Sequence, residues 1–341
     1  MPASLIIPAS LRRPGIIGAL TLLAMLAVLA SLAFGSSRLS AGQVWDTLFH
    51  SGSAPEDLHA IIFGVRIPRT ILGVIVGVCL GVAGTLMQGH TRNPLADPGI
   101  FGVSAGAGLA VVIGVFVFGV TGNAFTVVFA VVGALIASVA VFGITAAGSE
   151  PASPVPMALA GAAVSALLDA LTSFIVLADR DALEAYRLWV VGSLSGRPTG
   201  VAVAVLPFAA AGLLLAVLNT RALDNLSLGT EMARGLGENV LVARVVGLAA
   251  ITLLTAAATA AAGPVGFVGL VVPHLARPLV GAGHRWLLPA SALLGISLVL
   301  GADVVGRMIG GTGEVQVGIV LAVLGGPFFV AVARRRSLAA L

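Results

Sequence analysis

The chain has 341 residues, of which 58% are hydrophobic and only 9% are charged. A soluble domain usually carries about 25% charged residues, so this composition excludes an ordinary water-soluble fold and favours a protein embedded in lipid. All 18 basic residues are arginine, which excludes a phosphate-binding loop of the G-x-x-x-x-G-K-[ST] type on this chain, because that loop needs a lysine. The excess of arginine does not indicate nucleic-acid binding, since no basic run is interleaved with aromatic residues. A single cysteine, Cys79, cannot form an internal disulfide.

About ten apolar segments follow one another, most of them near the roughly 20 residues that cross a bilayer. We therefore expect an all-α, polytopic membrane protein forming one transmembrane domain over residues 1–341. The expected spans are 14–34, 61–89, 95–118, 122–147, 155–178, 188–218, 240–262, 263–281, 286–309 and 315–333. The first segment follows two arginines, as a secretory signal would, but it is too long for a typical signal core and is interpreted as a retained span.

The distribution of arginine predicts the orientation in the membrane. With ten spans and a cytoplasmic N-terminus, most arginines fall on the cytoplasmic side, including the run at 334–336. We therefore expect both termini in the cytoplasm and a multi-pass protein of the inner or plasma membrane. The 263–281 segment is short and rich in Gly and Pro, which leaves a nine-span alternative with the C-terminus outside.

Two connections are longer than the rest. Residues 36–60 contain Val44, Trp45, Leu48 and Phe49, a pattern typical of a short amphipathic helix in the membrane interface. Residues 219–239 form the longest polar stretch on the expected cytoplasmic side. Helix-forming residues alternate there with glycines, which predicts two short helices joined by a turn. A soluble partner is expected to dock on this loop.

Charges inside the expected spans are few, and each costs about 2.5–3.5 kcal/mol at a helix centre on insertion scales. Asp303 and Arg307 are four residues apart and can pair on one helix face, whereas Asp169 has no obvious partner. This scarcity indicates that energy for any transport arrives from elsewhere. The alternative is an ion-coupled secondary carrier that uses Asp169 or Asp303.

Residues 102–106 match G-x-S-x-G, which in a hydrolase presents a nucleophilic serine. Here no strand is expected before Ser104, and small residues in an apolar run also serve helix packing. His90 and His274 could each be a base, and His274 a metal ligand, but neither has a carboxylate at a telling spacing. A membrane-embedded hydrolase therefore remains a third alternative.

Arg66 and Arg69 flank Pro68 at the expected outer start of the second span. They could be interfacial anchors or a cationic rim that meets an acidic external partner. Further along the chain, residues 88–99 form a Gly- and Pro-rich turn, and residues 263–277 predict a broken helix. Irregular backbone at membrane depth must be buried in protein or line a wet cavity.

These stretches resemble the permease subunit of the iron–siderophore, haem and cobalamin class of ABC importers, the FecCD type. The resemblance covers about residues 60 to 336, and the order and spacing of its motifs together are specific. It rests on Arg66-Ile67-Pro68-Arg69, Gln88, Arg92-Asn93-Pro94-Leu95-Ala96-Asp97-Pro98, Gly102, Gly106-Ala107, Gly266-Phe267-Val268-Gly269-Leu270, Pro273-His274, Arg277, Leu288-Pro289, Ala302-Asp303, Arg307, Glu314, Gly318 and Gly325-Gly326-Pro327-Phe328.

The resemblance implies ten helices per subunit and a non-enzymatic importer permease without a cofactor or metal of its own. It implies a second permease copy, either identical or a close paralogue, two ATPase subunits that bind ATP at the cytoplasmic face, and an external substrate-binding protein. By matched position, Arg66, Arg69 and Arg307 would meet acidic residues of that binding protein. Coupling to the ATPase would use Leu228, Gly229, Glu231, Ala233, Arg234, Leu236 and Gly237. The cytoplasmic gate would include Glu150, Ser153 and Pro154.

Overall fold

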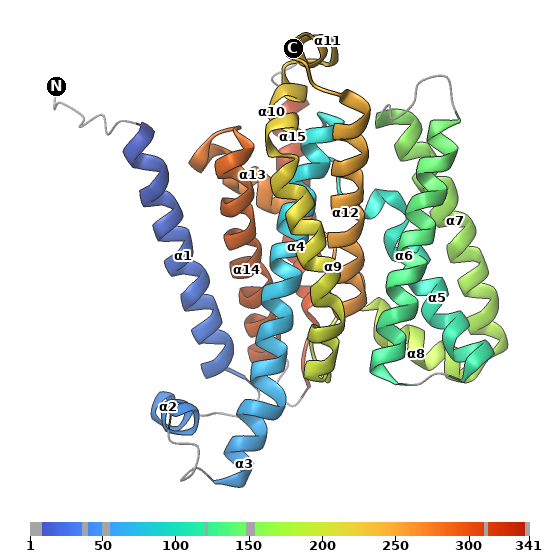
Figure 1. The fold of residues 1–341 in the computed structure, drawn as a ribbon. Coiled ribbons are helices and arrows are strands. Elements are labelled where there is room, and N and C mark those ends of the chain that lie inside the picture. The colour runs from blue at the N-terminus through green and yellow to red at the C-terminus, as the bar shows by residue number, and fades with distance from the viewer. Residues whose placement is uncertain are drawn as a thin grey trace.

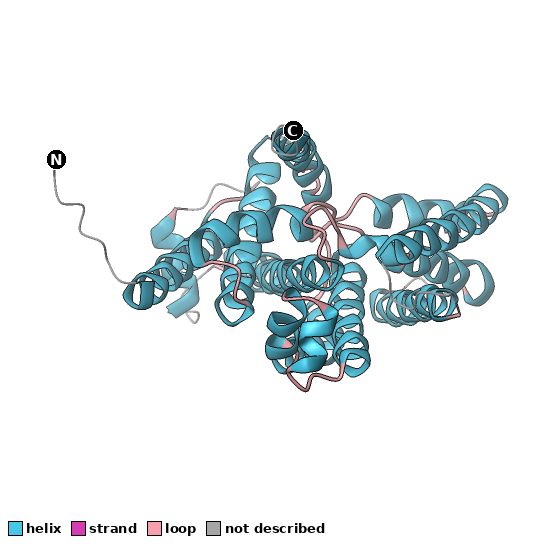
Figure 2. Ribbon diagram, turned by 90° about the horizontal axis from the view of Figure 1, so that it is seen from above, coloured by secondary structure: helices cyan, strands magenta, loops and turns pink. Residues whose placement is uncertain are grey.

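A computed structural model describes residues 9–35, 40–49, 55–119, 122–147, 154–309 and 313–337. Within these ranges the chain forms helices and loops without a β-strand, which confirms the all-α prediction for this part of the protein (Figures 1 and 2). Seven of the described helical stretches are long and apolar enough to cross a bilayer. They are α1 (Ala9–Ala33), α4 (Ile67–Thr91, continuous with the preceding segments), α6 (Asn123–Ala146), α7 (Pro154–Ala178), α9 (Thr199–Leu218), α12 (Val240–Ala262) and α14 (His284–Ile309).

Shorter helices complete the described fold. Three are apolar: α5 (Val103–Phe118), α13 (Val268–Val280) and α15 (Val317–Ser337), the last apolar over Val317–Ala331. The remainder are α2 (Ala41–Phe49), α3 (Glu56–His59), the π-helical segment η1 (Ala60–Arg66), the 3₁₀ turn η2 (Pro98–Phe101), α8 (Arg180–Val190), α10 (Thr220–Ser227) and α11 (Thr230–Gly235).

Helix α4 is the central element of the bundle. It packs against α14, α12, α13 and α9 (Figure 1). Close approach to α14 depends on glycine, because a Cβ atom on Gly77 would lie 2.6 Å from the backbone carbonyl carbon of Gly295. Small residues of this kind let helix backbones touch in a membrane, where lipid supplies no hydrophobic force between helices. Helices α5, α6, α7 and α8 pack together on one side of this centre, and α1 lies on the other (Figure 1).

The predicted span 188–218 is wrong at its N-terminal end. Helix α8 ends at Val190 and α9 starts only at Thr199, so the chain turns between two helices. Gly192 and Gly196 take positive φ angles of 73° and 67° in this turn, which glycine adopts without a steric penalty. The apolar composition on both sides concealed the break.

The predicted broken helix at 263–277 is confirmed. Residues 263–267 are not helical, and α13 begins at Val268. The backbone beside this break is held by the α8–α9 turn, since Ser193 donates its N–H to the carbonyl oxygen of Ala262 at 2.6 Å. Gly263, at the start of the break, is buried, and residues 264, 265 and 267 are partly covered, which suits irregular backbone in lipid.

The long connections agree with their predicted helices. Helix α2 occupies 41–49 within the predicted amphipathic stretch, with Val44 buried and Trp45 exposed. The 219–239 loop forms α10 and α11, joined by a turn at Gly229, as predicted. We call residues 219–239, which contain α10 and α11, the elbow. They lie at one end of the bundle, while α2, α3 and α8 lie at the other (Figure 1).

Candidate functional site

Arg66, Arg69 and Arg307 lie at the bundle end opposite the elbow, which we call the arginine end. Arg69 is the centre of the cluster. Its Nη2 is 2.8 Å from Asp303 Oδ1, and its Nη1 is 2.6 Å from Glu314 Oε2. The Nη1 group also donates to Ser195 Oγ at 3.4 Å. Arg69 is thus bound to three side chains that lie 126 to 245 residues away in the sequence.

The other two arginines close the cluster. Arg307 Nη2 is 3.1 Å from Asp303 Oδ2, as the four-residue spacing predicted, and it also donates to Ser31 Oγ on α1. Arg66 donates to the backbone carbonyl oxygens of Leu32 and Ala33 at the end of α1. Arg69 and Arg307 therefore share Asp303, Arg69 also holds Glu314, and Arg66 caps the carbonyl end of α1 beside them.

The three arginines are buried in the subunit and do not form an exposed rim. Arg66 and Arg69 are each 3% exposed, and Arg307 is 4% exposed. A guanidinium group removed from water needs carboxylate or carbonyl partners, and the fold supplies them. Sequence reasoning did bring the three arginines together, but it missed Ser31 and Ser195, because small serines in apolar surroundings carry no sequence signal of their own.

Glu314 lies just before α15, outside the apolar helices. Burial would raise its pKa, but the hydrogen bond and positive charge of Arg69 outweigh this effect and lower the pKa from its ordinary 4.5. The carboxylate is therefore ionised at neutral pH and remains bound to Arg69.

The elbow carries the seven predicted coupling residues. The side chains of Leu228, Leu236, Glu231 and Arg234 are exposed, and the last two form a surface ion pair at 2.8 Å. Gly229 and Gly237 have positive φ angles. Gly229 lies between α10 and α11, and Gly237 lies between α11 and α12. Ala233 is fully buried, in a small cluster with Ala222, Leu226, Val240 and Ala243. The elbow thus presents apolar side chains to its surroundings on a defined scaffold.

Four polar residues, of which the sequence analysis singled out only His90, join the elbow to the bundle. Asp224 Oδ1 on α10 accepts from the His284 backbone N–H at 2.9 Å and from His284 Nδ1 at 2.6 Å. Asn219, at the start of α10, donates to His90 Nε2 on α4 and to the carbonyl oxygen of Ala243 on α12, both at 3.0 Å. A displacement of α10 therefore acts directly on α4, α12 and α14.

The predicted gate lies mostly outside the described residues. Glu150 and Ser153 fall there, and Pro154 is the first residue of α7. The gate stays a prediction.

The residues of the two alternative chemistries lie in different environments. Asp303 is enclosed between Arg69 and Arg307, whereas Asp169 is exposed on α7. Ser104 lines a cavity of about 170 Å³ together with Asp97 and Thr259, and none of the described histidines lines it. Within the described ranges, no three His, Cys, Asp or Glu side chains gather as metal ligands would.

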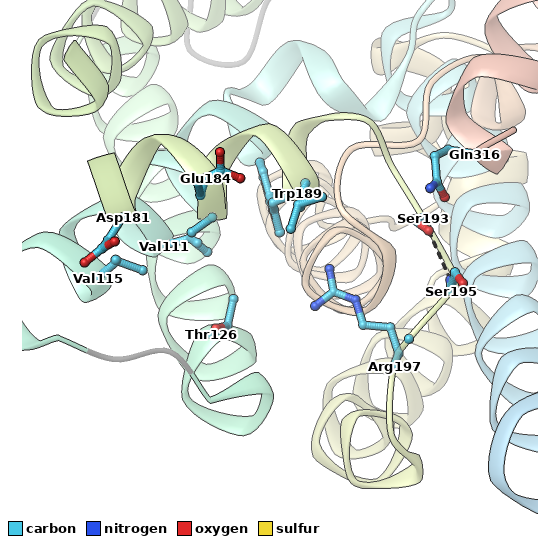
Figure 3. Close-up of a pocket in the computed structure, with 13 residues that line it drawn as sticks. Val111, Val115, Thr126, Asp181, Glu184, Trp189, Ser193, Ser195, Arg197 and Gln316 are labelled. Atoms are coloured by element: carbon cyan, nitrogen blue, oxygen red, sulfur yellow. Dashed lines mark hydrogen bonds between the residues drawn. The ribbon is translucent and has the colours of Figure 1, made fainter. Parts of the chain in front are cut away.

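A larger pocket, of about 640 Å³, opens at the arginine end between α5, α6, α8 and the turn that precedes α9 (Figure 3). Its lining is partly apolar and partly polar, and includes Asp181, Glu184, Trp189, Ser195, Arg197 and Gln316. Ser195 also contacts Arg69, so the pocket adjoins the arginine cluster.

Comparison with known proteins identifies the family of this chain. Residues 22–335 match the model of the FecCD transport family. The chain is 41% identical over 338 residues to the ferric enterobactin transport system permease protein FepD of Escherichia coli, covering 99% of both chains. It is 40% identical over 305 residues to the Fe(3+)-citrate import system permease protein YfmD of Bacillus subtilis, covering 89% of this chain and 90% of the relative.

A solved structure agrees with both relatives. A metal-chelate type ABC transporter in an inward-facing conformation superposes with a TM-score of 0.81 at 29% identity, covering 94% of this chain and 99% of that one. Family, relatives and structure point to transport rather than enzymatic chemistry, in agreement with seven membrane-length apolar helices in the described part of the chain. The chain is a multi-pass membrane permease, and it belongs to the FecCD transport family.

Proposed function

We propose that this chain is the transmembrane subunit of an ABC importer that moves a metal chelate into the cell. Its cargo would be an iron chelate, such as a siderophore complex or haem, or a cobalamin. An external binding protein would deliver the cargo, and two ATPase subunits would bind and hydrolyse ATP. Relatives named for ferric enterobactin and Fe(3+)-citrate match nearly the whole chain, and they favour an iron chelate.

The proposed topology has ten spans in one domain over residues 1–341, formed by the seven long apolar helices together with α5, α13 and α15. Both termini and the elbow would face the cytoplasm, and the arginine end would face outward. A cysteine introduced at exposed Ser227 should react with a membrane-impermeant maleimide in inverted vesicles but not in intact cells. Labelling in intact cells would show that the elbow faces outward and would contradict this orientation.

The observation that carries the proposal is the construction of the elbow. It exposes Leu228 and Leu236 beside an ion pair, and it is hydrogen-bonded to three bundle helices through Asp224 and Asn219. Such an element can bind a soluble ATPase on one face and transmit its motion to the helices on the other.

Replacing Leu228 and Leu236 with aspartate should remove the ATPase from the complex, because the substitutions put charge into the apolar contact. The measurement is co-purification of the ATPase with the tagged permease, followed by ATP-dependent uptake in vesicles. Leu183→Asp, at an exposed leucine of α8 at the opposite end, is the matched control and should retain the ATPase. Full retention by the elbow variant would refute the coupling role.

We propose that the binding protein docks at the arginine end, where acidic side chains would approach the Arg66, Arg69 and Arg307 cluster. Because these groups are buried, we expect their electrostatic potential at the surface to contribute more to docking than exposed ion pairs do. Arg66→Gln should slow association of the binding protein at low salt, whereas Arg180→Gln, at an exposed position of α8, should change it less. Equal association rates in the two stably folded variants would refute docking at the arginine cluster.

A second permease copy, identical or a close paralogue, is proposed to cover α7. Only 17% of its membrane window is buried, and Asp169 lies exposed on it. A carboxylate facing lipid would cost about 2.5–3.5 kcal/mol, so a protein surface or a wet pathway is the better environment. The gate of Glu150, Ser153 and Pro154 would lie at the start of this same helix. An ion-coupled carrier is not favoured, because Asp303 is enclosed by two arginines.

A further inference from the structure

The pocket at the arginine end contains a cation that the described structure leaves without a partner. Arg197 extends from the α8–α9 turn into the pocket (Figure 3). No hydrogen bond or ion pair reaches its guanidinium group from any of the described residues. Burial lowers the pKa of Arg197, yet a guanidinium group stays charged at neutral pH. Leaving such a group half-buried and unpaired is costly, which points to an absent anionic ligand.

The positive and negative groups of the pocket lie on opposite sides, with Arg197 on the turn and Asp181 on α8. Ser193, Ser195 and the amide of Gln316 lie on the side of the turn, while Asp181 lies across the pocket on α8 (Figure 3). Glu184, also on α8, is already paired with Arg187 at 2.9 Å. An anion beside Arg197 would therefore meet hydroxyl and amide donors first, with the exposed carboxylates of α8 at the rim.

The size and walls of the pocket suit a compact organic ligand. Its volume of about 640 Å³ falls within the roughly 300–1,000 Å³ typical of small-molecule sites. The buried Trp189 contributes an aromatic wall. The planar fork of an arginine binds paired oxygen anions with defined geometry, so a ligand rich in anionic oxygen fits best.

We propose that this pocket receives the cargo on its way from the binding protein, and that Arg197 contacts an anionic oxygen of a ferric chelate. The inference rests on the proposed function and specifies its substrate class as negatively charged chelates. Ferric complexes of catecholates and citrate belong to this class, because their ligand oxygens carry more negative charge than Fe³⁺ neutralises. Ser195 links the pocket to Arg69, so cargo arrival and docking of the binding protein would act on neighbouring groups.

Fluorescence of Trp189 tests the proposal directly. The full chain is reconstituted with its ATPase in lipid nanodiscs and titrated with ferric citrate, ferric tris(2,3-dihydroxybenzoate) and a neutral ferric trihydroxamate. At least one anionic probe should quench Trp189 saturably, and the neutral probe should not. Trp189→Phe, which keeps Trp45 and Trp286, corrects for absorption by the probes.

Arg197→Gln should weaken the anionic response at least tenfold, and Arg197→Lys should weaken it less, since it keeps the charge without the fork. Arg180→Gln, outside the pocket, should match the wild type. An unchanged titration with Arg197→Gln, or no saturable response to either anionic probe, would overturn the inference.

Two further measurements distinguish a failure of this inference from a failure of the proposed function. If the wild-type protein shows no ATP-dependent uptake of the native cargo, the proposed function itself is wrong. Normal uptake with unchanged apparent KM in Arg197→Gln would count against the pocket alone. If Arg197→Gln instead weakens docking of the cargo-free binding protein, the anionic group belongs to that protein and the cargo assignment is wrong.

Discussion

Helices α4 and α7 are both apolar and long enough to span a membrane, but they have different environments. The window that ends with α4 has a mean hydropathy of 2.2 and is 78% buried, whereas that of α7 has a mean hydropathy of 1.9 and is only 17% buried. Hydropathy therefore places both in lipid without showing which one forms the centre. In a bilayer, apolar side chains are as compatible with lipid tails as with protein, so other features decide position.

For α4 these features are glycine and arginine. Glycine at position 77 permits backbone contact with α14, and Arg69 requires carboxylates that only a packed neighbour can supply. Helix α7 instead exposes Phe174, Leu177 and Asp169. The difference indicates that α4 is fixed within one subunit, while α7 depends on what lies beside it in the assembly.

The largest expected effect comes from making the same substitution on the two sides of this comparison. Asp303→Asn leaves the buried Arg307 without its carboxylate partner and Arg69 with Glu314 alone, and an uncompensated buried charge typically costs about 3–5 kcal/mol. Asp169→Asn removes an exposed carboxylate and should change the stability of the isolated subunit by less than about 0.5 kcal/mol. Thermal unfolding of the detergent-purified permease measures both. Equal destabilisation would mean that Asp169 is paired within the subunit.

Glycine contact should give a smaller effect. Gly77→Ala places a Cβ atom 2.6 Å from the Gly295 backbone, and such overpacking costs about 1–3 kcal/mol. Gly143→Ala on α6 meets no atom within 4 Å, so it should be neutral or stabilise by up to about 1 kcal/mol. The same unfolding measurement separates them, and tolerance of both would show that α4 and α14 can move apart.

The smallest expected effect is a pH dependence at the arginine end. Because Arg69 lowers the pKa of Glu314 in the folded protein, the stabilisation is complete above the ordinary pKa of 4.5 and is lost as pH falls through the lower folded value. The melting temperature of the wild type should therefore drop on acidification below 4.5 by a component that Glu314→Gln lacks. Parallel pH profiles for the two proteins would exclude this ion pair as a source of stability.

Much of the fold could be predicted from residue patterns. The apolar segments located all seven long spanning helices of the described chain, and glycines among helix formers located the elbow. The boundary between α8 and α9 was missed, because an apolar run gives no sign of a turn when its glycines also suit helix packing. The network of Asp224 with His284 was missed too, since 60 residues separate its members.

The sequence by itself determined that the chain lies in lipid, carries no lysine-bearing nucleotide loop, and places Asp303 and Arg307 on one helix face, because composition and helical periodicity are local properties. Only the tertiary structure decided that the three arginines are buried, that α4 rather than α7 is central, and that Arg197 lines a pocket without a described partner. Those outcomes depend on which helices touch, and contact between distant segments is fixed by packing and charge pairing across the whole bundle.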